Sequence, residues 1–198
     1  SLLLDGEKIY FDCVFNAIHG TPGEDGLMQA YFELLNIPHT SCGFYQAALT
    51  FNKRDLLSVL KPYGVKSAAS FYLNKGDTIN EDAIIKKVNL PCFVKANKSG
   101  SSYGITKVHK KEDLQNAIEV AYKEDDEIII EEFLEGTEVS VGVLKYKGQT
   151  TILPITEIVT ENDFLDYEAK YEGKSQEITP VTYNNLTLPT IHSAPIHG

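Results

Sequence analysis

The 198-residue sequence is poor in cysteine and arginine and contains no long apolar run. Its three cysteines, Cys13, Cys42 and Cys92, are odd in number and lack Cys-x-x-Cys spacing, which argues against a disulfide framework and a structural metal. No apolar stretch approaches the ~20 residues that cross a bilayer. The first residues also lack the basic head and apolar run of a secretion signal. We therefore expect a cytoplasmic protein with reduced thiols and no membrane partner.

Positive charge is scarce as well. The formal net charge is -10 at pH 7, and Arg54 is the only arginine among 18 basic residues. Because a general nucleic-acid binder presents a basic face, no nucleic-acid partner is expected. An anionic ligand would have to be bound by individual lysines and by backbone amides. The 42% hydrophobic content is enough for a core, so the chain can form one large domain or two small ones.

Helical and strand-like patterns alternate along the chain. Helices are expected at 27–35, 53–61, 81–89 and 112–122. Strands are expected at 9–18, 67–73, 91–96, 104–109, 127–134, 138–146 and 150–159. The sequence therefore predicts an α+β fold with long antiparallel strands. An exposed loop is expected at 160–180, and a tail without periodicity at 181–198.

The segment "FVKANKSGSSYGITKV" at 93–108 joins a buried-strand pattern to a glycine-flanked polar loop. Lys95 stands at the end of the strand, where an unpaired charge is costly, so its partner is either a phosphate or a carboxylate of the protein. The loop matches neither the Walker A nor the Rossmann glycine pattern. Gly100 and Gly104 still permit backbone amides to converge on an anion, and the serines between them add hydroxyl donors. A plain hairpin loop is the alternative.

Polar residues in other segments are further candidates for ligand binding. Glu131 and Glu138 flank the connector in "IIIEEFLEGTE", where a carboxylate can accept hydrogen bonds from a ribose or an amino group. The alternative is a surface strand with acidic ends. His19 in "HGTPGEDG" precedes a helix N-terminus, and it is a core imidazole, a substrate contact or an acid–base group. Lys53 opens a helix and Lys170 lies in the loop "DYEAKY", and each is either a surface lysine or a ligand-binding group.

Four segments taken together resemble the D-alanine–D-alanine ligases of the ATP-grasp family. They are "HGTPGEDGLMQAYFELLNIPHT", "FVKANKSGSSYGITKV", "EIIIEEFLEGTEVSVGVL" and "DYEAKYEGKSQEITP", in the family order and at family-like spacings over roughly residues 11–180. The resemblance implies an ATP-grasp fold, in which two α+β lobes hold ATP between them. It divides the chain into a remnant of the N-terminal, substrate-side lobe at 1–50, the central ATP-binding region at 51–180 and an unmatched tail at 181–198.

The resemblance also implies a reaction and a set of site residues. ATP phosphorylates the carboxylate of one D-alanine and leaves as ADP; the amine of a second D-alanine then attacks the acyl phosphate and displaces phosphate, which yields D-alanyl-D-alanine for peptidoglycan synthesis. The implied nucleotide contacts are Lys53, Lys95, Ser101, Ser102, Glu131, Glu132, Phe133, Leu134, Glu138 and Lys170. The implied catalytic residues are Lys170 near the transferred phosphoryl group, the pair Ser101 and Tyr171 that locks the loops shut, and His19 on the substrate side.

The sequence departs from the family pattern at several positions. Ala96 stands where the family usually has proline, Asn52 where aspartate is common, and His39 where tyrosine is frequent. The family's opening strand, its glycine-rich loop and a substrate-binding glutamate are expected before Ser1. The family's arginine and its Asp/Glu/Asn ligands for two Mg²⁺ (or Mn²⁺) ions have no counterpart in 181–198, which contains no Asp, Glu or Arg. No metal ligand is therefore expected in this chain.

Two alternatives to a D-alanine–D-alanine ligase stay open. The first is another ATP-grasp carboxylate–amine or carboxylate–hydroxyl ligase, such as a D-alanine–D-lactate enzyme, although Tyr171 within "YEAKY" resembles the D-alanine type. The second is a catalytically inactive nucleotide-binding fragment. The expected partners are the small molecules D-alanine and ATP, and a homodimer is left open.

Overall fold

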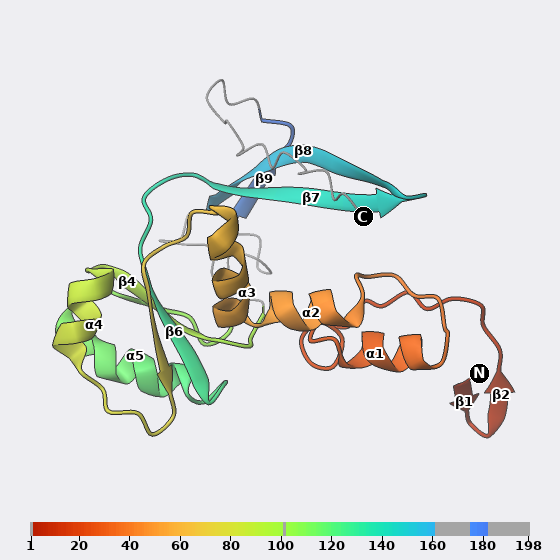
Figure 1. The fold of residues 1–198 in the computed structure, drawn as a ribbon, viewed down its shortest axis with the longest axis horizontal. Helices are drawn as coiled ribbons and strands as arrows, with labels where there is room; N and C mark the ends of the chain where they lie inside the picture. Colours follow the sequence, from red (N-terminus) through yellow and green to blue (C-terminus); the bar gives the residue numbers. More distant parts are fainter. Residues whose placement is uncertain (1, 101, 161–174, 182–198) are drawn as a thin grey trace. The chain divides into compact units, whose positions relative to one another are not determined.

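The computed structural model describes residues 2–100, 102–160 and 175–181 (Figure 1). The chain separates into two compact units, Ser1–Phe133 and Leu134–Gly198, and each is considered by itself. No helix in the described ranges combines the length and the apolarity that crossing a bilayer requires.

The first unit begins with a two-stranded antiparallel hairpin and continues with three short helices. The strands are β1 (Leu2–Leu4) and β2 (Glu7–Ile9), and the helices are α1 (Leu27–Leu34), α2 (Phe44–Phe51) and α3 (Lys53–Leu60). The helices predicted at 27–35 and 53–61 are confirmed as α1 and α3, whereas α2 was not predicted. Asn52 separates α2 from α3 and caps α3, because its side-chain oxygen accepts a hydrogen bond from the Asp55 amide at 3.0 Å.

The strand predicted at 9–18 is wrong. β2 ends at Ile9, and among the described residues the chain that follows pairs only through an isolated parallel bridge between Val14 and His39. The Val14 amide donates to the Pro38 carbonyl at 2.9 Å. The apolar pattern is present, yet Phe15 is 80% exposed, because no strand in the described part of the chain extends this pairing into a sheet.

A four-stranded antiparallel sheet forms the rest of the first unit. Its strands are β3 (Ser70–Asn74), β4 (Cys92–Ala96), β5 (Thr106–Val108) and β6 (Glu127–Glu132), in the order β3-β6-β4-β5. Helix α4 (Glu81–Val88) joins β3 to β4, and α5 (Leu114–Ala121) joins β5 to β6 (Figure 1). Two 3-10 turns, η1 (Lys61–Tyr63) and η2 (Lys111–Asp113), follow α3 and precede α5. This arrangement confirms the predicted α+β class.

Buried and half-buried residues alternate along β4, which distinguishes the two faces of the sheet. Val94 is fully buried and pairs with Ile130, whereas the next residue, Lys95, pairs with Ile129 on the opposite face. The core consists of Leu73, Ile84, Val88, Cys92, Val94, Val108, Leu114, Ala117, Ile118, Ala121, Ile128 and Ile130. These residues come from the strands and from α4 and α5. The two helices therefore cover the apolar face, and the charged side chain of Lys95 lies on the other.

The second unit is a three-stranded antiparallel sheet. Its strands are β7 (Glu138–Tyr146), β8 (Gln149–Thr160) and β9 (Ser175–Ile178), in the order β7-β8-β9. The turn predicted at Lys147 and Gly148 is confirmed, since Tyr146 pairs with Gln149 across it. The loop predicted at 160–180 is partly wrong, because β9 pairs with β8. The remainder of that loop, 161–174, and the tail from residue 182 lie outside the described residues.

Replacing Ile118 tests how much the contact between α5 and the sheet stabilises the first unit. Ile118 is fully buried, so Ile118→Ala leaves a cavity in the core and should lower the free energy of unfolding by about 3 kcal/mol. Urea denaturation followed by far-UV circular dichroism measures the change. Asn116→Ala, on the exposed side of the same helix, is the control and should change the free energy by no more than about 0.5 kcal/mol. Equal effects of the two variants would contradict the packing described.

Candidate functional site

Lys95 and Glu131 form an ion pair on the sheet face opposite α4 and α5. Lys95 Nζ lies 2.7 Å from Glu131 Oε2, and the two side chains are 24% and 14% exposed. Lys95 Nζ also lies 5.2 Å from the centre of the Phe93 ring. The antiparallel register produces this contact, since Phe93 pairs with Glu131 and Lys95 pairs with Ile129. Of the two partners predicted for Lys95, the carboxylate is present, and the phosphate remains a prediction.

Lys53, the first residue of α3, lies against the loop that follows β4. Its ammonium nitrogen donates hydrogen bonds to the carbonyl oxygens of Asn97 at 3.2 Å and Ser99 at 2.6 Å. Its backbone amide lies 3.3 Å from the same Asn97 carbonyl. We call residues 97–104 the 97–104 loop. The two lysines predicted to bind phosphates therefore lie at the same end of β4, one in the strand and one against the start of this loop.

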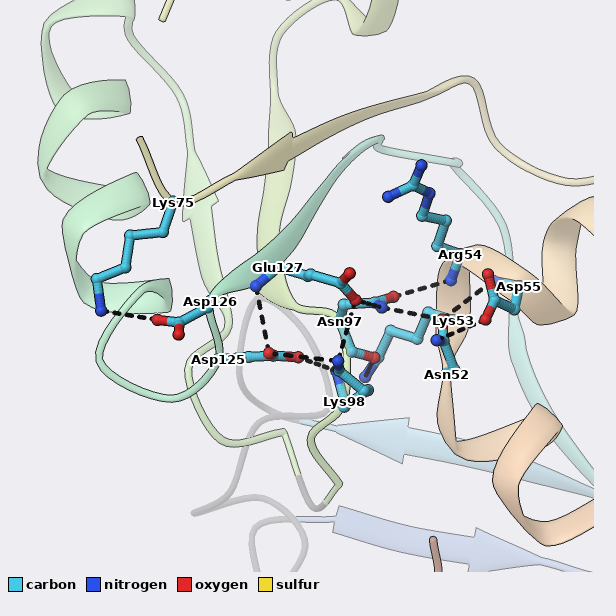
Figure 2. Close-up of polar contacts among 10 residues, drawn as sticks. All are labelled: Asn52, Lys53, Arg54, Asp55, Lys75, Asn97, Lys98, Asp125, Asp126 and Glu127. Carbon is cyan, nitrogen blue, oxygen red and sulfur yellow. Dashed lines mark hydrogen bonds and ion pairs between the residues drawn. The ribbon is translucent and has the colours of Figure 1, made fainter. Parts of the chain in front are cut away.

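Carboxylates beside β6 fix the start of the 97–104 loop (Figure 2). The Lys98 amide donates to Asp125 Oδ2 at 2.7 Å, and the Lys98 ammonium lies 3.1 Å from Glu127 Oε2. This ammonium holds the pKa of Glu127 below its ordinary value, and a hydrogen bond from the buried Asn97 amide acts in the same direction. The carboxylate in turn raises the pKa of Lys98. Both groups are therefore charged at neutral pH.

His19 lines a cavity of about 560 Å³ whose walls come from the 15–24 segment and from α2. This volume lies within the ~300–1,000 Å³ of small-molecule sites. Glu24 Oε2 accepts a hydrogen bond from the Gly20 amide. The same oxygen lies 3.4 Å from the position that a Cβ would take on Gly100. The segment that carries His19 therefore approaches the 97–104 loop within the first unit.

Glu132 and Phe133 continue the chain beyond Glu131. Glu132 Oε2 accepts a hydrogen bond from the Ala69 amide at 3.2 Å. The centre of the Phe133 ring lies 6.0 Å from that of Phe93 and 4.1 Å from the Lys107 ammonium. Beside Lys95, the sheet thus carries two aromatic rings with positive charges next to them.

The remaining predicted site residues lie in other parts of the sequence. Ser102 lies in the 97–104 loop with a left-handed φ of 60°. Leu134 and Glu138 belong to the second unit, where both are exposed. Ser101, Lys170 and Tyr171 lie outside the described residues. The predicted residues gathered around β4 and β6 are Lys53, Lys95, Glu131, Glu132 and Phe133.

Sequence reasoning missed Asn97 and Glu127, which connect α3 to the sheet. The two residues are 30 positions apart, and no local pattern reports their hydrogen bond of 3.1 Å. The usable signal was Asn52, which departs from the family pattern. Its side-chain oxygen accepts a hydrogen bond from Asn97 Nδ2 at 2.9 Å, across 45 positions of sequence.

The described residues do not fit the two-metal site of the family. In residues 2–100, 102–160 and 175–181, no group of three or more His, Cys, Asp or Glu side chains is placed to hold a metal ion.

Comparison with known proteins gives matches over most of the chain. The D-ala D-ala ligase N-terminus family model matches residues 4–42, and the D-ala D-ala ligase C-terminus model matches residues 59–193. The second match continues past residue 180, where the resemblance drawn from the motifs ends.

Individual relatives agree with the family models. The D-alanine–D-alanine ligase of Flavobacterium johnsoniae is 74% identical over 180 residues, which are 91% of this chain and 56% of that protein. The VanG D-Ala:D-Ser ligase of Enterococcus faecalis is similar in structure, with a TM-score of 0.75 and 35% identity over 90% of this chain and 52% of that chain. D-alanyl-alanine synthetase A of Vibrio cholerae has a TM-score of 0.79 and 27% identity over 93% of this chain and 56% of that chain.

The antiparallel sheet backed by two helices, together with these structural relatives, defines an ATP-grasp fold. Within that class, the chain belongs to the D-alanine–D-alanine ligase family. It spans about half the length of the curated relatives that it matches.

The contact between Lys98 and Glu127 predicts a measurable change of pKa. Lys98→Met removes the ammonium that stabilises the Glu127 carboxylate and keeps a side chain of similar length, so the pKa of Glu127 should rise towards its ordinary value. An NMR titration of the Glu127 carboxyl carbon measures it. Lys111→Met, which removes an ammonium 2.6 Å from Asp82, is the control and should leave the pKa of Glu127 unchanged.

The same contact gives folding stability a pH dependence of defined sign. A carboxyl group whose pKa is lower in the folded state contributes its full stabilisation above the unfolded pKa, about 4.3 for Glu. That contribution is lost as the pH falls through the lower folded pKa. Lys98→Met should therefore reduce the part of the acid-induced stability loss that Glu127 causes. An unaltered pKa of Glu127 in this variant would contradict the assignment of Lys98 as its principal cause.

Proposed function

We propose that this chain carries the nucleotide-binding part of an ATP-dependent ligase that joins two D-alanines to D-alanyl-D-alanine through an acyl phosphate, for peptidoglycan precursor synthesis. The observation that carries the proposal is the placement of Lys95 and Lys53 at one end of β4, where the 97–104 loop begins. Family membership supports the choice of substrates.

The triphosphate of ATP is proposed to bind at the ammonium groups of Lys95 and Lys53. Glu131 holds the Lys95 ammonium at 2.7 Å while leaving the side chain 24% exposed, so this charge is in place before a ligand arrives. Charge-assisted hydrogen bonds from ammonium to phosphate oxygens are about twice as strong as neutral ones. Lys53 donates to carbonyls of the 97–104 loop, so phosphate binding at Lys53 would act directly on the position of that loop.

The adenosine part of ATP is proposed to lie along residues 131–138. The carboxylate of Glu131 is assigned to the adenine amino group, the backbone of Glu132, Phe133 and Leu134 to the adenine edge, and Glu138 to the ribose. The aromatic rings of Phe93 and Phe133, 6.0 Å apart, support this placement because a planar base packs well on an aromatic surface.

The remaining roles concern closure of the site and the transfer step. Ser101 and Ser102 are proposed to cover the phosphates, and Ser101 to pair with Tyr171 so that water is excluded. Lys170 is assigned to the transferred phosphoryl group, whose charge it would stabilise in the transition state. His19 is placed on the D-alanine side, which its position on the 560 Å³ cavity supports.

The setting of the reaction is part of the proposal. ATP is assigned with Mg²⁺ or Mn²⁺, for which no ligand is assigned in this chain. We place the protein in the cytoplasm and leave open whether it forms a homodimer. The division into a substrate-side region at 1–50, an ATP-binding region at 51–180 and a tail at 181–198 is likewise proposed.

Ligation of D-alanine to a different acceptor is a second candidate. The observation that favours it is the structural similarity to a protein named as a D-Ala:D-Ser ligase, at 35% identity. D-lactate is a further acceptor of the same class of reaction. These candidates share the nucleotide site and differ only in the second substrate.

Removing the Lys95 ammonium tests the phosphate assignment. Lys95→Ala should weaken ATP binding by about 1–3 kcal/mol, the scale of a charge-assisted hydrogen bond, as measured by titration calorimetry with ATP and Mg²⁺. Lys75→Ala, which breaks an exposed ion pair with Asp126 at 2.7 Å, is the matched control and should leave binding unchanged. Unchanged ATP binding by Lys95→Ala together with a lower unfolding free energy would mean that the pair with Glu131 is only structural.

A product assay tests the reaction and its second substrate. With ATP, Mg²⁺ and equal amounts of D-alanine, D-serine and D-lactate, we expect D-alanyl-D-alanine as the main product. The rate should lie below that of the Flavobacterium johnsoniae ligase, because this chain spans 56% of that protein. A depsipeptide as the main product would identify D-lactate as the acceptor instead of D-alanine, and D-alanyl-D-serine would identify D-serine. Intact ATP binding without any product would establish the nucleotide-binding fragment instead.

A further inference from the structure

Asn97, the first residue after β4, is fully buried and links two segments that are distant in sequence (Figure 2). Its Oδ1 accepts a hydrogen bond from the Arg54 amide at 2.9 Å, and its Nδ2 donates to Asn52 Oδ1 at 2.9 Å and Glu127 Oε2 at 3.1 Å. Its backbone amide donates to the Glu127 carbonyl at 2.9 Å, and its carbonyl accepts from Lys53. One residue therefore holds both the start of α3 and the start of β6.

These partners fix the orientation of the Asn97 amide. Rotating it by half a turn would place its NH₂ group against the Arg54 amide and its oxygen against two acceptors, Asn52 Oδ1 and the Glu127 carboxylate. This orientation would leave buried donors and acceptors without hydrogen-bond partners, and each such group strongly destabilises the folded state. Aspartate, serine and aliphatic side chains all lack the combination of one acceptor and two donors that these contacts use. The position therefore requires a carboxamide side chain, which asparagine supplies.

The hydrogen bonds of Asn97 act on the first turn of α3. The first amides of a helix have no partner within the helix and need outside acceptors. Asn52 accepts from the Asp55 amide and Asn97 accepts from the Arg54 amide, so the two asparagines together satisfy this turn. Lys53 is the first residue of that turn. The position of the Lys53 side chain therefore depends on how the first turn of α3 is held against β4.

We propose that Asn97 is a positioning residue that acts through Lys53. It fixes the first turn of α3 against the end of β4 and so holds the Lys53 ammonium where the triphosphate of ATP is proposed to bind. The inference rests on the proposed nucleotide site and assigns to Asn97 no contact with the nucleotide itself. Charge-assisted hydrogen bonds are about twice as strong as neutral ones, so displacement of the Lys53 ammonium should be visible in ATP affinity.

A double-mutant cycle tests whether Asn97 acts through Lys53. Asn97→Ala, Lys53→Ala and the double variant are titrated with ATP and Mg²⁺ in the 198-residue chain. We expect Asn97→Ala to weaken ATP binding about tenfold in the parent chain and to have no further effect when residue 53 is alanine. Asn80→Ala is the matched control, because Asn80 caps α4 by accepting from the Ala83 amide at 3.0 Å, and its ATP affinity should be unchanged.

Hydrogen exchange of the Arg54 amide gives a second measurement that needs no nucleotide. Asn97→Ala removes the acceptor of this amide, so its exchange should become about tenfold faster while the amides of α5 keep their rates. Asn52→Ala is a milder variant that removes one partner of Asn97 at a partly exposed position. Like Asn97→Ala, it should weaken ATP binding and speed exchange of the Arg54 amide. It replaces Asn97→Ala in the test if that variant does not fold.

Effects of Asn97→Ala and Lys53→Ala that multiply in the double variant would overturn the inference, since Asn97 would then act independently of Lys53. Unaltered Arg54 exchange in both asparagine variants would overturn it as well. A parent chain that does not bind ATP would refute the proposed nucleotide site, and Arg54 exchange would still decide whether Asn97 holds the start of α3. The two failures are therefore distinguishable.

Discussion

The two-residue alternation of an extended strand determines where each group of the candidate site lies. In β4, Cys92, Val94 and Ala96 are buried, whereas Phe93 and Lys95 lie on the other face. A shift of one residue would place the Lys95 ammonium beneath α4 and α5, where an unpaired charge is strongly unfavourable. The apolar contact with the helices therefore sets the register of β4, and the register in turn brings Lys95 to Glu131.

Elements defined by local periodicity could be predicted from the sequence. The helical period of α5 and the apolar runs of β4 and β6 are present in the residues themselves. Helix α2 was missed because its N-cap, Gly43, has no side chain, so the usual local start signal is absent. The acceptor of its first amide, that of Phe44, is instead Glu33 Oε1, eleven positions away. The strand at 9–18 was predicted wrongly because strand formation also needs a partner, and an apolar pattern carries no information about one.

The candidate site could be predicted residue by residue but not as an arrangement. The family motifs identify Lys53, Lys95 and Glu131 individually, yet the Lys95–Glu131 contact joins residues 36 positions apart. Only the structure gives a physical reason for asparagine at position 52, where aspartate is common in the family. Asn52 Nδ2 donates to Asp55 Oδ2 at 2.7 Å, and an aspartate at position 52 would set a second carboxylate against Asp55.

The buried Asn97 has a consequence for the lengths of the segments around it. The hydrogen bonds of Asn97 join α3 to β4 directly. The segment at 64–68, between η1 and β3, therefore does not set the spacing of α3 and β4. Insertions and deletions in this segment change mainly the entropy of loop closure, which grows slowly with loop length. One residue inserted between Lys95 and Asn97 would move Asn97 by about 3.3 Å and reverse the face it presents. Changes in chain length are thus tolerated in the segment at 64–68 and are not tolerated between Lys95 and Asn97.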